Sequence, residues 1–159
     1  SADALVTALK GKSIDLCAHL TSSQTAQLDS DFQILEGTMN LVQAVYLNNA
    51  VAPFDNQQVR QALCYAIDRQ TIMDMIADGH GTALGSSIYP AFTKYFLPEL
   101  VQKYPYDPAK AKELLAQAGY PNGFDMTISV PSNYQPHMDT AEVVAEQLHH
   151  PAHGVGRVA

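Results

Sequence analysis

Two helix starts follow each other in residues 53–70, which read PFDNQQVRQALCYAIDRQ. Asp55, followed at the third position by Gln58, has the spacing of a capping box, in which side chains satisfy free amide groups at a helix start. Apolar residues then recur at helical spacing and predict one buried face: Val59, Ala62, Leu63, Ala66 and Ile67. Asp68 is predicted to cap a second helix, whose apolar set is Ile72, Met73 and Ile76. The stretch therefore predicts two consecutive helices, each with one apolar face.

A further helix with marked ends is predicted in residues 104–124, which read YPYDPAKAKELLAQAGYPNGF. Asp107 is the expected N-cap, and Pro108 takes the first helical position, where its missing amide proton costs nothing. Gly119 is expected to end the helix in the left-handed conformation. The predicted buried stripe between these ends is Ala111, Leu114, Leu115 and Ala118.

The remaining pattern predicts strands and helices that alternate along the chain. A half-buried strand is predicted over 124–130, where the apolar residues Phe124, Met126, Ile128 and Val130 alternate with polar ones. Further strands are predicted at 14–18, 32–35 and 42–48. Further helices are predicted at 2–10, after a capping box at Thr21, and after a cap at Asp139. This order favours an α/β fold (mixed α+β layering), with one mixed sheet flanked by helices.

The two marked stretches also resemble segments of one transport family. The patterns P-F-D-x-x-x-V-R-Q-A-L-x-Y-A-I-D-R and Y-D-P-x-K-A-K-x-L-L-x-x-A-G-Y-P-x-G-F occur in the same order in that family. They are similar to the peptide-binding class of ABC-transporter substrate-binding proteins, solute-binding family 5. The resemblance covers about residues 1–148. It implies an incomplete periplasmic-binding-protein-like lobe, part of the second lobe of a receptor whose two lobes close over a peptide.

The resemblance also implies what such a receptor does. It would lie outside the cytoplasm, in the periplasm or as a cell-surface lipoprotein, and deliver a peptide or related solute to ABC permease subunits without catalysis. Residues 1–148 would then be a partial lobe inside a longer precursor. Residues 149–159 depart from the family pattern, and Pro151 is expected to end the last helix, so an atypical tail without fixed structure is predicted. The family also includes receptors for nickel chelates and oligosaccharides, which remain open alternatives.

The composition is that of a globular chain without basic surfaces. The 159 residues are 47% hydrophobic and 16% charged. Their formal net charge of -7 argues against nucleic acid or an anionic membrane as a partner. No apolar run approaches the roughly 18 residues that a membrane-spanning helix needs. Cys17 and Cys64 are expected to be buried free thiols, with a disulfide between them as the alternative.

The best candidates for contacting a solute lie in the loop PSNYQPH, residues 131–137, at the carboxyl end of a predicted strand. Ligands often bind at such loops in α/β folds, and the resemblance implies that this loop lines the cleft between lobes. The ligand-binding candidates are Asn133, Tyr134 and His137, of which the first two could hydrogen-bond a peptide backbone. A second set on the same analogy is Thr38, Met39 and Asn40. An ordinary surface loop is the alternative in both cases.

The sequence gives little support for catalysis or for metal binding. The motifs G-x-S-x-G and H-E-x-x-H are absent, so no catalytic residue, metal or cofactor is predicted. A small hydrolase with an unrecognised site is the alternative function. His149, His150 and His153 lie close in sequence, but Pro151 interrupts the helix that would align them for a metal. An unpaired sheet edge predicts that the isolated chain associates with a second copy.

Overall fold

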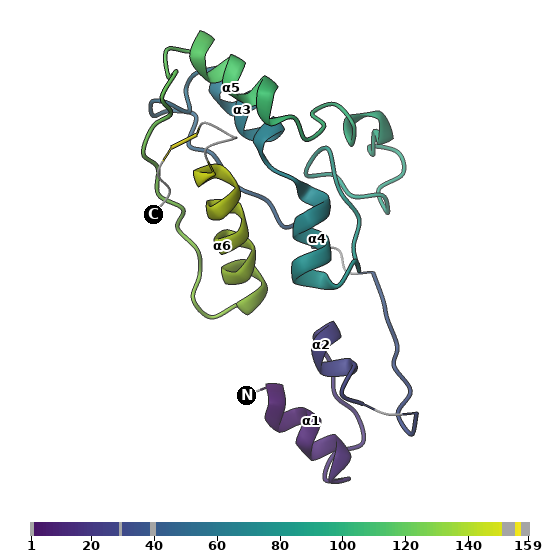
Figure 1. Ribbon diagram of the computed structural model, residues 1–159. Helices are drawn as coiled ribbons and strands as arrows, with labels where there is room; N and C mark the ends of the chain where they lie inside the picture. The colour runs from purple at the N-terminus through teal and green to yellow at the C-terminus, as the bar shows by residue number, and fades with distance from the viewer. Residues whose placement is uncertain (1, 29, 39–40, 151–154, 157–159) are drawn as a thin grey trace.

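The computed structural model describes residues 2–28, 30–38, 41–150 and 155–156 (Figure 1). The regular elements in these residues are helical: α1 (Ala2–Lys10), α2 (Ser22–Thr25), α3 (Gln57–Ala66), α4 (Arg69–Ala77), the 3-10 helix η1 (Pro98–Leu100), α5 (Pro108–Gln117) and α6 (Gln135–His149). None of the helices in this described part is long and apolar enough to cross a membrane.

The apolar core forms where α3 packs along α5 and where α6 packs against α3. Its buried residues are Val59, Ala62, Leu63, Ala66, Ala111, Leu114, Leu115, Val144, Leu148 and Val155. The helix faces predicted for α3 and α5 are therefore confirmed, with Ile67 and Ala118 partly buried at the edge of the cluster. The apolar set predicted for α4, which is Ile72, Met73 and Ile76, is only half-buried. Helical spacing places these residues on facing stripes, so the two helices remove each other's apolar area from water.

The start of α3 lies one residue later than predicted. Asn56, and not Asp55, is the N-cap, because the Asn56 side chain accepts a hydrogen bond from the amide of Gln58 at 2.8 Å. Asn and Asp are about equally good caps, so a sequence pattern does not choose between two adjacent ones.

The other predicted helix ends in the marked stretches are confirmed. Asp68 caps α4 by accepting hydrogen bonds from two backbone amides of the first turn, at 3.1 and 3.2 Å. Asp107 caps α5, and Pro108 occupies its first turn. Gly119 follows α5 with φ of 91°, the left-handed conformation that glycine adopts without strain. Thr21 caps α2 in a complete capping box.

The last helix, by contrast, begins earlier than predicted. α6 starts at Gln135, with Tyr134 as the N-cap residue and Pro136 in the first turn. The fixed φ of proline suits the first turn of a helix, which favours this start. Asp139 is therefore not a cap; it lies inside the helix, where its carboxylate accepts a hydrogen bond from Gln135 Nε2 at 2.6 Å.

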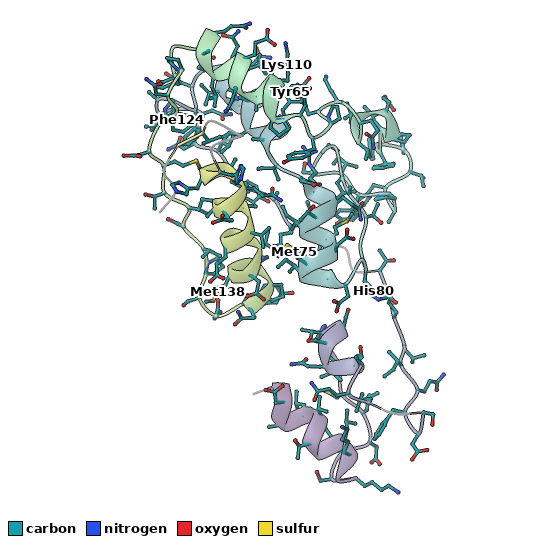
Figure 2. All side chains as sticks on the ribbon, in the orientation of Figure 1. Tyr65, Met75, His80, Lys110, Phe124 and Met138 are labelled. Carbon is teal, nitrogen blue, oxygen red and sulfur yellow. The ribbon has the colours of Figure 1, made fainter. Side chains whose placement is uncertain are left out.

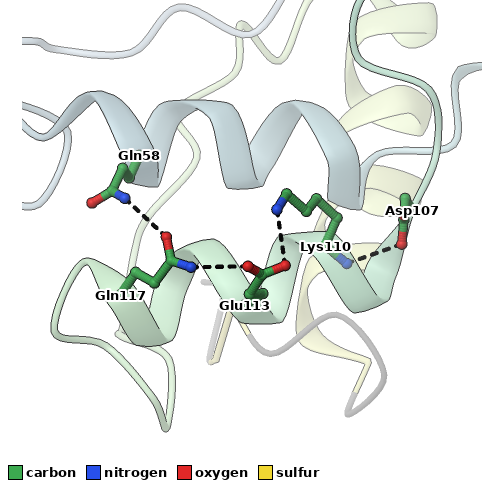
Figure 3. A network of polar contacts seen from close by, with 5 residues as sticks. All are labelled: Gln58, Asp107, Lys110, Glu113 and Gln117. Carbon is green, nitrogen blue, oxygen red and sulfur yellow. Dashed lines mark hydrogen bonds and ion pairs between the residues drawn. The ribbon is translucent and has the colours of Figure 1, made fainter.

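A line of polar contacts joins α3 to α5 (Figure 3). Gln58 Nε2 donates to Gln117 Oε1 at 3.1 Å, and Gln117 Nε2 donates to Glu113 Oε1 at 2.9 Å. Lys110 Nζ lies 2.9 Å from the other carboxylate oxygen of Glu113. This hydrogen bond from Lys110 lowers the pKa of the Glu113 carboxyl group. The side chains are exposed to solvent, so the contacts add little to stability.

The predicted mixed sheet is not present in the described residues. The stretches 14–18, 32–35, 42–48 and 124–130 form no strand there, although Met126 makes an isolated β-bridge. The predicted alternation is present in the burial of side chains over 124–128: Phe124, Met126 and Ile128 pack against the core while the residues between them are exposed. Val130, the last residue of the predicted set, is exposed. Alternation reports which side chains are buried, whereas a strand also needs a neighbour that pairs its backbone groups.

In the N-terminal arm, defined here as residues 2–48, helices α1 and α2 lie apart from the core (Figure 1), whereas Leu47 packs against it. Its helices α1 and α2 contact each other, and Val6 and Leu9 of α1 are buried outside the main cluster. An irregular segment then leads back to α3. Large apolar side chains of the arm are strongly exposed, with Leu16 at 84% and Tyr46 at 86%. The arm therefore contributes little to the buried core.

Two residues of the predicted tail are packed against the body of the molecule. Val155 is fully buried, and its carbonyl accepts a hydrogen bond from the amide of Phe124 at 2.6 Å. Gly156 has φ of 106°, and a Cβ at this position would lie 2.5 Å from the Phe124 carbonyl oxygen, so the close approach requires glycine. These two residues differ from the tail without fixed structure that the sequence predicts. The domain division after residue 148 stays a prediction.

Candidate functional site

The first candidate set lies together at the N-terminal end of α6. Asn133 is in an exposed turn before the helix, Tyr134 is 39% exposed, and His137 is half-buried in the first turn. The rings of Tyr134 and His137 have centroids 4.5 Å apart and are inclined at 59°. An amide, a phenol and an imidazole are thus grouped on one helix end, where they can hydrogen-bond a solute or stack on it.

The second candidate set belongs to a segment that reaches the first. Thr38 is exposed, while Met39 and Asn40 lie outside the described residues. A few residues further on, Gln43 Nε2 donates a hydrogen bond to the carbonyl of Pro136 at 3.1 Å. Gln43 is absent from the sequence-based candidates, because one glutamine among apolar residues has no pattern of its own. The structure therefore brings Gln43, a residue that sequence reasoning missed, to the helix end that carries the first set.

The same segment is also tied to the region that follows α4. His80 Nδ1 lies 2.9 Å from Glu36 Oε1, and both side chains are more than half exposed. α4 packs beside α6, and Figure 2 shows His80 past the end of α4 and Met138 in α6 at the same end of this helix pair. Glu36 and Gln43 therefore fasten the segment to both sides of the end where the candidates lie.

Residues of the two marked stretches lie away from the candidate site and hold the helices together. Arg69 Nη1 donates to the Tyr104 carbonyl at 3.0 Å, and its Nη2 donates to the Cys64 carbonyl at 3.4 Å. The Tyr65 and Tyr104 rings meet edge to face, with centroids 5.4 Å apart. The amide of Asp107 donates to the Tyr65 carbonyl at 2.9 Å. These contacts join the first marked stretch to the second.

Gln147 fixes the C-terminal half of α6 in a similar way. Its Oε1 accepts a hydrogen bond from the Asp68 amide at 3.0 Å, and its Nε2 donates to the Asp68 carbonyl at 3.3 Å. Val144 and Leu148, on the same half of the helix, are buried in the core. The C-terminal half of α6 is therefore anchored at the junction of α3 and α4.

Other titratable groups form no evident reactive centre within the described part of the chain. No group of three or more His, Cys, Asp or Glu residues there is placed to hold a metal ion. His153, from the histidine cluster near the C-terminus, lies outside that part. Cys17 and Cys64 carry free thiols and are half-buried, not fully buried as predicted. Burial raises the pKa of the Cys64 thiol, and the charge of Arg69 opposes this shift.

Comparison with known protein families shows to which family this chain belongs. The family described as "Bacterial extracellular solute-binding proteins, family 5 Middle" matches residues 1–153. The chain belongs to this family. The family resemblance of the two marked stretches is thereby confirmed.

Curated family 5 members resemble this chain over much of its length. Heme-binding protein A of Haemophilus influenzae is 40% identical over 119 residues, which are 74% of this chain and 21% of that protein. The glutathione-binding protein GsiB of Escherichia coli is 36% identical over 106 residues, which are 65% of this chain and 20% of that protein. The chain thus spans about a fifth of the length of these family 5 relatives.

Solved structures of solute-binding proteins also resemble this chain over most of its length. The binding protein AgaA from A. tumefacien, solved with agropinic acid, matches with a TM-score of 0.61 and 33% identity, over 70% of this chain and 22% of that one. The oligopeptide-binding protein AppA from Bacillus subtilis, solved with a nonapeptide, matches with a TM-score of 0.55 and 27% identity, over 70% of this chain and 24% of that one. Both neighbours are solute-binding proteins in complex with a solute.

Proposed function

We propose that this chain is part of a receptor that binds a peptide or a related small solute outside the cytoplasm. The receptor delivers the solute to ABC permease subunits and does not alter it chemically. The observation that carries the proposal is the family match over residues 1–153. It is supported by structural neighbours that hold agropinic acid and a nonapeptide.

The chemistry at the N-terminal end of α6 favours a peptide-like solute. Asn133 and Tyr134 offer an amide and a hydroxyl group, which can pair with a peptide backbone whatever its side chains are. His137 adds an aromatic ring beside Tyr134. Thr38, Met39 and Asn40 form the other part of the proposed contact surface. Glutathione, which names one set of relatives, is itself a short peptide and is a suitable probe.

The remainder of the receptor has a defined role in this proposal. We infer that further chain pairs with the arm and with residues 124–130, which completes a mixed sheet and a periplasmic-binding-protein-like lobe. The strong exposure of Leu35 (79%) and Tyr46 in the arm supports a missing neighbour. Because affinity is what remains after the costs of association and ordering, half of a binding cleft leaves little of it. The isolated chain should therefore bind a peptide only weakly.

An NMR titration tests the proposed site. Adding glutathione to the isotope-labelled chain should shift the amide signals of Asn133, Tyr134 and His137, with a Kd on the order of millimolar. Tyr134→Ala should weaken binding, whereas Tyr95→Ala, which removes another exposed tyrosine, should leave it unchanged.

Three results would count against this proposal. Shifts confined to other parts of the chain would contradict the proposed site. Micromolar binding by the isolated chain would contradict the role given to the missing part. Turnover of generic ester or peptide substrates would favour an enzyme.

The isolated chain is also expected to associate with a second copy. The apolar side chains that the arm exposes can be covered by the same surface of another chain, giving a two-fold dimer. Light scattering over a concentration series should show the average mass rising above 17.3 kDa. Tyr46→Asp should reduce this rise, and a constant monomer mass at high concentration would contradict the expectation.

A further inference from the structure

The hydrogen bond from Gln43 to Pro136 joins residues that are 93 positions apart, at the N-terminal end of α6. Pro136 lies between Tyr134 and His137, the two aromatic candidates. The Gln43 side-chain amide therefore contacts the helix turn that carries both rings. This long-range contact is the starting point of the inference.

The first turn of α6 contains no fully buried side chain. Tyr134 makes no side-chain capping hydrogen bond, so the helix start lacks the usual local restraint. The residues of α6 that are fully buried, Val144 and Leu148, both lie in its C-terminal half, as does the anchor at Gln147. The residues from 135 to 143 are partly or wholly exposed. The C-terminal half of the helix is thus fixed by the core, whereas its N-terminal half has no fully buried side chain.

We propose that Gln43 is a positioning residue of the solute site. Its donated hydrogen bond holds the first turn of α6 in place and thereby sets the Tyr134 and His137 rings in their inclined arrangement. Its part in solute binding rests on the proposed function, whereas its effect on the rings does not. A ring pair that is already oriented loses less freedom when a solute binds.

The test uses variants that differ in the donor alone. Gln43→Glu keeps the shape of the side chain but replaces the donor with a carboxylate that repels the Pro136 carbonyl. Gln43→Arg keeps an N–H donor. Gln102→Glu introduces the same charge at an exposed glutamine elsewhere, and serves as the matched control. Circular dichroism and the amide spectrum of the Leu115 region establish that each variant keeps the helical core.

The first readout needs no solute. Nuclear Overhauser contacts between the ring protons of Tyr134 and His137 should be lost or strongly weakened in Gln43→Glu. They should remain in Gln43→Arg and in Gln102→Glu. If Gln43→Glu keeps the ring contacts at full strength, the positioning role is overturned. This outcome is independent of whether any solute binds.

The second readout is the Kd for glutathione from the titration described above. Gln43→Glu should raise it about threefold or more, with recovery in Gln43→Arg, because the binding groups must then be ordered by the solute itself. Loss of the ring contacts with an unchanged Kd would overturn the claim that the positioning serves solute binding. If the unmodified chain gives no binding of glutathione, the proposed function fails for this probe, while the ring contacts still decide the role of Gln43.

Discussion

The helical core and the N-terminal arm differ in how far their large apolar side chains are exposed to solvent. In the helical core, which consists of α3, α5, α6 and Val155, Leu115 and Leu148 are only 1% exposed. In the arm, Leu16 and Tyr46 are almost fully exposed. The core residues pack against one another within the described chain. The arm buries Val6 and Leu9 but leaves several large apolar side chains exposed. The difference indicates that the core carries most of the stability of the chain, and it agrees with the proposal that further chain packs against the arm.

The largest expected effect comes from removing a core side chain. Leu115→Ala should lower the free energy of unfolding by about 2–5 kcal/mol, because the surrounding helices cannot fully close the cavity. Leu16→Ala in the arm should change it by no more than about 0.5 kcal/mol. Urea unfolding followed by circular dichroism measures both values. Equal losses of unfolding free energy in the two variants would show that the arm unfolds with the core. They would contradict the difference between the two regions.

Removal of the Arg69 guanidinium should have the next largest effect. Arg69→Ala leaves the carbonyls of Tyr104 and Cys64 without their donor, and should cost about 2 kcal/mol in the same unfolding experiment. Arg69→Lys keeps the charge but cannot reach both carbonyls as a fork, so it should recover only part of the loss. Full recovery with lysine would show that charge alone matters at this position.

The caps of α3 offer a smaller and more local test. Asn56→Ala should cost about 1 kcal/mol, because the Gln58 amide loses its partner. Asp55→Ala, one residue earlier, should have little effect, since the Asp55 side chain does not cap the helix. The ratio of the two losses, read from unfolding midpoints, checks the assignment. A larger loss at Asp55 would restore the cap predicted from the sequence.

The two cysteines report on the two regions separately, because Cys17 is in the arm and Cys64 is on α3. The thiolate is the reactive form, and burial raises the pKa of the Cys64 thiol. A thiol reagent at pH 8 should therefore label Cys17 faster than Cys64 in the folded chain, with the difference lost in urea. Cys17→Ser should abolish the fast phase. Equal rates in the folded chain would argue that α3 opens as readily as the arm.

The raised pKa of Cys64 also fixes the sign of a small pH effect. The folded state favours the neutral thiol, so this contribution to stability is fully present below the usual thiol pKa of about 8.5. It fades as the pH rises through the raised value in the folded state. Cys64→Ala should flatten the decline of the unfolding free energy in this alkaline range, as measured by urea unfolding at a series of pH values.

The core could be predicted from the sequence because its signals are local. The spacing of Val59 and Leu63, and the cap at Asp68, depend on residues within one or two helical turns. The sheet could not be established in the same way, since alternation at Phe124 and Met126 does not say which segment pairs with them. The family resemblance identified a sheet-containing lobe, but this chain spans only about a fifth of its relatives.

The residues of the candidate site were also only partly predictable from the sequence. Tyr134 and His137 could be selected because they lie in one short polar loop, and the structure brings their rings together. Gln43 could not, because its partner is 93 residues away and neither residue carries a motif. The cap at Asn56 was missed for a different reason, since two adjacent residues had nearly equal capping ability.

The contact between Arg69 and Tyr104 has a consequence for how this fold tolerates change in length. It ties Tyr104 to the first residue of α4, so that the chain returns to the start of α4 after the intervening segment. Each doubling of such a loop adds only about 0.6 kcal/mol to the entropic cost of closing it. Insertions between α4 and η1 should therefore leave the packing of α3 on α5 unchanged. The segment is a place where new sequence, whether acquired in evolution or added as a reporter tag, can be accommodated without disturbing the helices on either side.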